Sequence, residues 1–165
     1  MISPPQQSKW HVLAMWCVAV VLTSASFLIT AADTPYPGMN VVRTEHGFDK
    51  LLGRLERAIA DHKMGLVAQA SASRGAAARG VKIPGNAVLM VFRNDYAVRM
   101  LEASVPAGIE APLRLYVTEN RDGTASITYR LPSAVFAPYG SGELDRMAKE
   151  LDVIFRSIVR DAAGR

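Results

Sequence analysis

The chain has 165 residues, which is enough for one domain with its own hydrophobic core and too few for two substantial ones. Its formal net charge is +4; because Lys9 is the only charged residue before position 33, the remainder carries 18 of the 19 basic residues and all 15 acidic ones. Basic and acidic residues alternate along that remainder, and arginines do not interleave with aromatic residues. This pattern argues against a nucleic-acid-binding surface, so we expect no nucleic-acid partner.

Residues 1–32 have the pattern of an export signal. Lys9 precedes an uninterrupted apolar run at residues 12–22, and small and hydroxylated residues follow it. These are the three parts of a secretory signal peptide. The alternative is a retained membrane anchor, because residues 12–31 form an uncharged stretch of about the length that spans a bilayer. Both interpretations predict a periplasmic or otherwise extracytoplasmic domain, tethered to the inner membrane through residues 12–31 only if the leader stays uncleaved.

The remaining chain reads as one domain after a short linker. Cys17 is the only cysteine and lies in the leader, so the domain has neither a disulfide nor a thiol nucleophile of its own. Residues 33–40 are rich in Pro and Gly, as linkers often are. We therefore predict a single domain over residues 41–160.

The most regular pattern of the domain lies in residues 112–131. Apolar residues alternate with polar ones over residues 113–118 and again over residues 125–131, and a turn-forming stretch at residues 120–123 separates the two runs. The spacing predicts a β-hairpin with one apolar face. Such a face needs apolar cover from another part of the chain.

Two amphipathic segments can supply that cover. Apolar residues recur at helical spacing over residues 48–59 and over residues 144–158. Each run follows a residue that suits the N-cap of a helix, Gly47 in the first case and Ser141 in the second. We therefore expect two long helices to pack on the same side of one sheet.

Shorter elements complete the predicted order. Residues 41–42 begin a short edge strand, residues 66–70 form a second strand, and the continuous apolar run at residues 87–92 is typical of a central strand. Residues 71–80 predict an alanine-rich helix, and Asn94 is the expected N-cap of another short helix. The fold class is therefore α+β, with an antiparallel sheet covered by two amphipathic helices.

Several of these segments resemble the family catalogued as domain of unknown function 302. The resemblance covers residues 41–138 and rests, in order, on FDKLLGRLERAI, LVAQA, GVKIP, VLMVFRND and EAPLRLYVTENRDG. It implies an α+β fold related to the TATA-binding-protein type and a homodimer formed through sheet or helix contacts. The family has no established activity.

The chain departs from the family pattern at several polar positions. The Asp-His pair of the family is replaced by Ser71 and Ala72 at the start of the alanine-rich helix. Asn94 and Glu110 are the only matching polar positions that remain in the other two motifs. Any chemistry that the family histidine performs is therefore absent from this chain.

The sequence contains no recognisable catalytic constellation. His46 and His62 have no second histidine or cysteine at metal-ligand spacing, so we expect no metal, no cofactor and no assigned catalytic residue. We expect an exported, non-catalytic domain that binds a small apolar ligand or a protein partner. Methionines are adaptable lining for such a surface, and the candidates are Met64, Met90 and Met100.

An enzyme whose polar groups converge only in three dimensions is the alternative. Asn94, Glu110 and Arg114 flank the central strand and the entrance to the hairpin, which makes them the candidate ligand-binding residues. They can share one substrate only if their side chains lie within about 8 Å of one another on the same side of the sheet.

Overall fold

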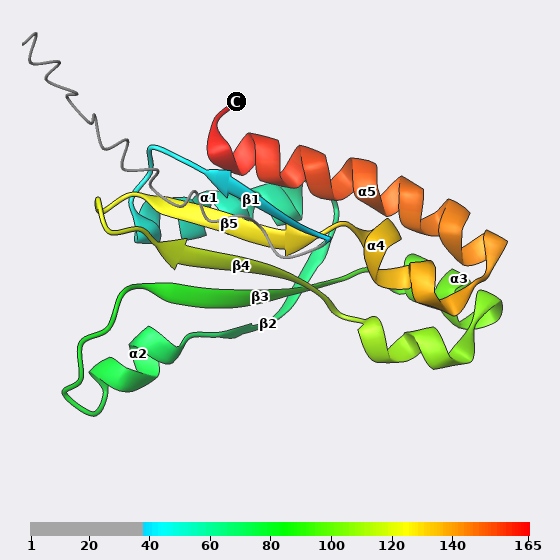
Figure 1. The fold of residues 1–165 in the computed structure, drawn as a ribbon, viewed down its shortest axis with the longest axis horizontal. Helices are drawn as coiled ribbons and strands as arrows, with labels where there is room; N and C mark the ends of the chain where they lie inside the picture. Colours follow the sequence, from blue (N-terminus) through cyan, green and yellow to red (C-terminus); the bar gives the residue numbers. More distant parts are fainter. Residues whose placement is uncertain (1–37) are drawn as a thin grey trace, which may run out of the picture. The chain divides into compact units, whose positions relative to one another are not determined.

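The computed structural model describes residues 38–165, and these residues lie within one compact unit. The strands are β1 (Met39–Arg43), β2 (Gly65–Ala70), β3 (Asn86–Phe92), β4 (Leu113–Glu119) and β5 (Ala125–Arg130). The helices are α1 (Phe48–Asp61), α2 (Ala72–Ala77), α3 (Asn94–Ala103), α4 (Pro132–Phe136) and α5 (Gly142–Ala163). Two 3-10 turns, η1 (Val105–Glu110) and η2 (Ala137–Tyr139), complete the order (Figure 1).

The strands form one five-stranded sheet in the order β1-β5-β4-β3-β2, and every neighbouring pair is antiparallel. The predicted hairpin is confirmed as β4 and β5. Its turn contains Gly123 at a φ of +81°, a conformation that glycine adopts without strain. Asp122 stabilises the same turn by accepting hydrogen bonds from the backbone N–H and the hydroxyl of Thr124, at 3.0 and 2.6 Å.

Both long helices cover one face of this sheet, as the sequence predicts. Figure 1 shows α5 lying along the sheet with α1 beside it. Alternate residues of β4 and β5 are buried beneath them, whereas their neighbours along each strand are not, apart from Ser126 near the hairpin turn. The largest fully buried side chains are Phe136, Phe155, Leu51, Leu55, Ile59, Leu89, Leu115, Ile127, Leu144, Ile158, Val91 and Val117. The α+β fold class is therefore confirmed.

Polar contacts hold the ends of α5. Ser141 caps its first turn by accepting a hydrogen bond from the backbone N–H of Leu144, at 3.3 Å. At the other end, Arg54 of α1 donates to the carbonyl oxygens of Asp161 and Ala162, at 2.7 and 2.6 Å. Because the last carbonyls of a helix lack partners within it, this guanidinium both caps α5 and joins it to α1.

Two local predictions differ from the structure. The middle strand is β4, and the apolar β3 lies one place nearer the edge. Asn94 is the first residue of α3 rather than its N-cap; Arg93 has the extended cap conformation and makes no side-chain cap bond. Between α3 and the hairpin lies η1, whose Pro106 suits the first turn of a helix.

No helix within residues 38–165 is long and apolar enough to cross a bilayer. The predicted leader lies outside the described residues.

The packing of α5 on the sheet generates a stability prediction. Phe155 is completely buried, whereas Val153 of the same helix is 62% exposed. Phe155→Ala should lower the free energy of unfolding by about 3–5 kcal/mol, because it leaves a cavity in the core. Val153→Ala, the matched control, should change it by about 0.5 kcal/mol or less. Urea denaturation measures both values, and an equal loss in the two variants would contradict this packing.

Candidate functional site

The face of the sheet opposite α1 and α5 is the candidate site, and we call it the open sheet face. Its strand positions are Met39, Val41, Arg43, Ser126, Thr128, Arg130, Arg114, Tyr116, Thr118, Asn86, Val88, Met90, Phe92, Gly65, Ala68 and Ala70. The side chains of Val41 and Tyr116 are 37% and 39% exposed, although both belong to strands of a well-packed sheet. Exposed apolar side chains that adjoin one another are a common mark of a binding surface.

One row of this face crosses the whole sheet. Val41 pairs with Thr128, Thr128 with Tyr116, Tyr116 with Val88, and Val88 with Ala70. Paired residues point to the same side of an antiparallel sheet, so these five side chains form a continuous band. Apart from the hydroxyls of threonine and tyrosine, the band is apolar.

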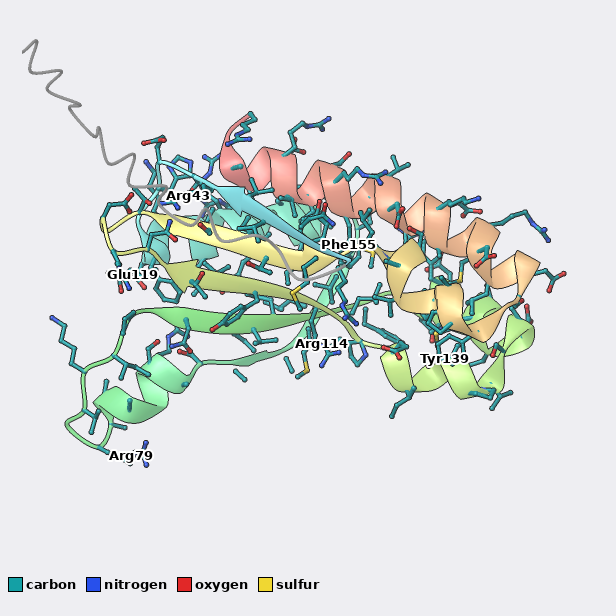
Figure 2. The ribbon with its side chains drawn as sticks, viewed as in Figure 1. Arg43, Arg79, Arg114, Glu119, Tyr139 and Phe155 are labelled. Carbon is teal, nitrogen blue, oxygen red and sulfur yellow. The ribbon has the colours of Figure 1, made fainter. Side chains whose placement is uncertain are left out.

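Arg114 is the one predicted site residue that lies on the open sheet face. It is an exposed residue of β4 and pairs with Met90 of β3. In Figure 2, Phe155 lies between α5 and the sheet, whereas Arg114 extends from β4 away from α5.

The other two predicted residues lie on different elements. Asn94 is exposed at the start of α3. Glu110 ends η1 and accepts a hydrogen bond from the Tyr139 hydroxyl at 3.0 Å. Burial, together with this bond, raises the pKa of Tyr139. Within residues 38–165 no hydrogen bond or ion pair joins Asn94, Glu110 and Arg114, and their shared role in binding or catalysis stays a prediction.

Two of the predicted lining methionines meet at a small apolar hollow. Met64 and Met100 line it together with Met147 and Phe136, while Met90 points to the open sheet face. The hollow has a volume of about 30 Å³. Ligand pockets usually hold roughly 300–1,000 Å³, so this hollow is far smaller than a typical ligand site.

A stacked cluster closes the rim of that hollow. Tyr96 lies between the guanidinium groups of Arg93 and Arg99, at 4.3 and 5.2 Å from the ring centroid. Arg99 in turn donates to both carboxylate oxygens of Glu150, at 2.7 and 2.8 Å, and these bonds lower the pKa of Glu150. The charges here satisfy one another, so this cluster serves to fasten α3 to α5.

Neither His46 nor His62 lies in a cluster of potential metal ligands within the described residues. Residues 38–165 contain no group of three His, Cys, Asp or Glu side chains arranged to hold a metal ion. His62 contacts the Asp161 carboxylate at 2.8 Å, and that contact lowers the pKa of Asp161. It joins the end of α1 to the end of α5.

Comparison with known proteins identifies the family of the chain. The family model described as "Domain of unknown function DUF302" matches residues 40–162. The chain belongs to this family. A crystal structure of an uncharacterized conserved DUF302 protein from Bacillus stearothermophilus is similar, with a TM-score of 0.68 and 19% sequence identity over 78% of this chain and 99% of that one. No curated protein matches.

These findings confirm the family and the fold of this DUF302 domain. At 19% identity the likeness to the Bacillus protein concerns the fold alone. The functional hypothesis therefore depends on the residues of this chain.

Sequence reasoning missed Arg130 as a site residue. The alternation over residues 125–131 does place Arg130 on the same side of its strand as Ser126 and Thr128. The alternation does not give the register of β5 against β4. Only the pairing of the two strands shows which residue of β5 lies near Arg114.

His46 generates a prediction about pH. Its Nε2 atom is buried and has no hydrogen-bond partner among the described residues. Burial, followed by the charges of Arg54 and Lys50, lowers the His46 pKa below its ordinary value of 6.5. The unfolded chain then binds a proton more readily than the folded one, so stability falls as the pH drops below about 6.5.

His46→Gln should remove this part of the pH dependence. Between pH 7 and pH 5, the unfolding free energy of the variant should fall less than that of the original chain. Urea titrations at several pH values measure the difference, and parallel curves would contradict the lowered His46 pKa. The carboxylate of Asp161, which has a lowered pKa as well, acts below this window and does not obscure it.

Proposed function

We propose that this DUF302 protein is an exported, non-catalytic binding domain that holds a small apolar ligand on its open sheet face. The main support is the exposure of Val41 and Tyr116 within the band that crosses the sheet. Val88 of the same band is half-buried, as is Met90 in the next row. Covering these side chains would remove apolar surface from water at roughly 25 cal/mol per Å².

The polar groups of the open sheet face support binding more than catalysis. Its strand positions provide hydroxyl groups, one amide and three arginines, but no Asp, Glu or His. General acid–base chemistry near neutral pH requires a group that exchanges protons there, and arginine remains charged. A surface with these groups can orient a ligand without transforming it.

A thermal-shift measurement with decyl maltoside, an uncharged apolar probe, tests this proposal. The full-length chain is expressed with its leader and purified in the form that the cell produces. The probe, kept below its micelle concentration, should raise the unfolding midpoint of this protein. Tyr116→Ala should weaken the effect at least several-fold, because Tyr116 lies in the middle of the band.

Ile109→Ala is the matched control for that experiment. Ile109 is 83% exposed, but it belongs to η1 rather than to the sheet. Its substitution should leave the probe effect unchanged. Absence of any stabilisation, or an equal reduction in the two variants, would contradict apolar binding on the open sheet face.

A second copy of the chain is the rival occupant, since the family resemblance implies a homodimer. Light scattering after gel filtration separates the two cases. A dimer that Tyr116→Ala converts to a monomer would assign the open sheet face to self-association. A monomer, or a dimer that this substitution leaves intact, keeps the face available to a ligand.

Export is tested independently of binding. We expect cell fractionation to find the domain outside the cytoplasm, because the leader combines Lys9 with the apolar run at residues 12–22. N-terminal sequencing then decides between the two forms. A start near Asp33 indicates a cleaved signal peptide, whereas an intact leader indicates an anchor. Recovery of the protein from the cytosol would contradict both.

A further inference from the structure

We infer that the ligand of the open sheet face is an anionic amphiphile, and that Arg114 and Arg130 together bind its carboxylate or phosphate group. The inference rests on the proposed function, because it specifies the chemistry of the ligand at the same surface.

The two arginines lie on neighbouring strands, at one end of the ladder that joins β4 to β5. The paired residues run from Glu119 and Ala125 to Leu115 and Tyr129, and Arg114 and Arg130 are the next residue of each strand. Leu115 and Tyr129 are buried under the helices. Since side chains alternate along a strand, both arginines point to the open face, and both are exposed. Neither β4 nor β5 is an edge strand.

This arrangement brings two like charges onto neighbouring strands of the same sheet face. Like charges at facing positions of a sheet are destabilising. No strand position of the open sheet face is acidic, and within residues 38–165 neither Arg114 nor Arg130 makes a side-chain hydrogen bond or ion pair. By contrast, Arg43 on the same face reaches Asp122 at 3.4 Å, and Arg99 is held by Glu150 through two bonds.

An oxyanion would remove that repulsion. Each guanidinium presents several N–H donors in a plane, and carboxylate and phosphate groups accept two parallel hydrogen bonds from such a plane. Two neighbouring guanidinium groups can therefore hold one anion from both sides. The anion supplies the negative charge that the strand positions of this face lack.

Apolar side chains flank the arginine pair, and they specify the rest of the ligand. Met90 pairs with Arg114 on one side, and Met39 pairs with Arg130 on the other. The adjoining row is the band through Val41 and Tyr116, which spans four interstrand spacings, or about 19 Å. A ligand with a charged head group at the two arginines and an apolar chain along this band would contact both rows of side chains.

The residues of these two rows argue against a nucleic acid and against a second copy of the chain as the occupant of the open sheet face. A nucleic acid would meet the two arginines but needs a series of aromatic rings for its bases, and the strand positions of this face include only Tyr116 and Phe92, in separate rows. A second copy brings the same face, whose strand positions contain arginines but no carboxylate to pair with Arg114 or Arg130.

Calorimetry with probes of equal chain length tests the inference on the protein purified as above. The probes are decanoate, decyl phosphate and decyl maltoside below their micelle concentrations, with acetate as the head group alone. We expect the two anionic probes to bind at least tenfold more tightly than decyl maltoside, and acetate to bind weakly. The affinity of the anionic probes should fall as salt concentration rises, because salt screens exposed charges.

Substitutions then identify the arginines. Arg114→Gln and Arg130→Gln should each weaken decanoate binding at least fivefold and leave decyl maltoside binding unchanged. The unfolding midpoint of the ligand-free variants should stay equal or rise, since each substitution relieves the like-charge pair. Arg79→Gln, at an exposed arginine in the turn after α2 and away from the sheet face (Figure 2), should change neither property.

The outcomes separate the inference from the proposed function. Equal affinity for decanoate and decyl maltoside, or decanoate binding that survives both Gln substitutions, overturns the anionic inference and leaves apolar binding at the face intact. Absence of binding by every decyl probe overturns both. Binding of a single-stranded oligonucleotide that depends on Arg114 and Arg130, without binding of the decyl probes, assigns the face to nucleic acid and overturns both as well.

Discussion

Burial of two amphipathic helices on one side of the sheet is the constraint on which the rest of this DUF302 domain depends. Leu115 and Ile127 of the central hairpin are fully buried, and so are Leu55 of α1 and Phe155 of α5. Apolar burial of this kind is the largest favourable contribution to folding. Both long helices are thereby committed to one face, and within residues 38–165 the opposite face has no comparable cover.

The arrangement explains where a ligand can bind. The hollow beside Met64 and Met100 has a volume of about 30 Å³, which is far below that of a typical ligand pocket. The charged groups around that hollow are fastened to one another, as the bonds between Arg99 and Glu150 illustrate. The open sheet face also has exposed apolar side chains, and within residues 38–165 Arg114 and Arg130 form no ion pair.

Sequence patterns predicted the elements that follow a strict period. The alternation of β4 and β5 and the helical spacing of α1 and α5 are set by residues close together in the chain, so the hairpin and the two covering helices could be predicted. The N-terminus of α3 could not, because Arg93 takes the cap conformation before Asn94 without a side-chain bond. Asparagine is a favoured N-cap residue, but the helix begins one residue earlier than this preference predicts, with only Arg93 between it and the end of β3.

The candidate site is harder to predict from the sequence than the fold, because it depends on the pairing between strands. Arg114 could be selected from its place at the entrance to the hairpin. Arg130 could not, since its importance comes from lying beside Arg114 in the sheet. A shift of one residue in register would send either side chain to the core side instead. The prediction that Asn94 and Glu110 share a site with Arg114 depends on chain position alone. Those two residues lie on α3 and η1.

The departures from the family motif also direct attention away from the alanine-rich helix. Ser71, which stands at one of the two motif positions, caps α2 by accepting a hydrogen bond from the backbone N–H of Arg74 at 3.1 Å. The backbone N–H of Ala72, at the other, donates to the Asn86 side chain at 3.0 Å. Both positions therefore serve local structure in this chain. The proposed role that depends on side-chain charge lies instead at Arg114 and Arg130, which form no side-chain hydrogen bond or ion pair within residues 38–165.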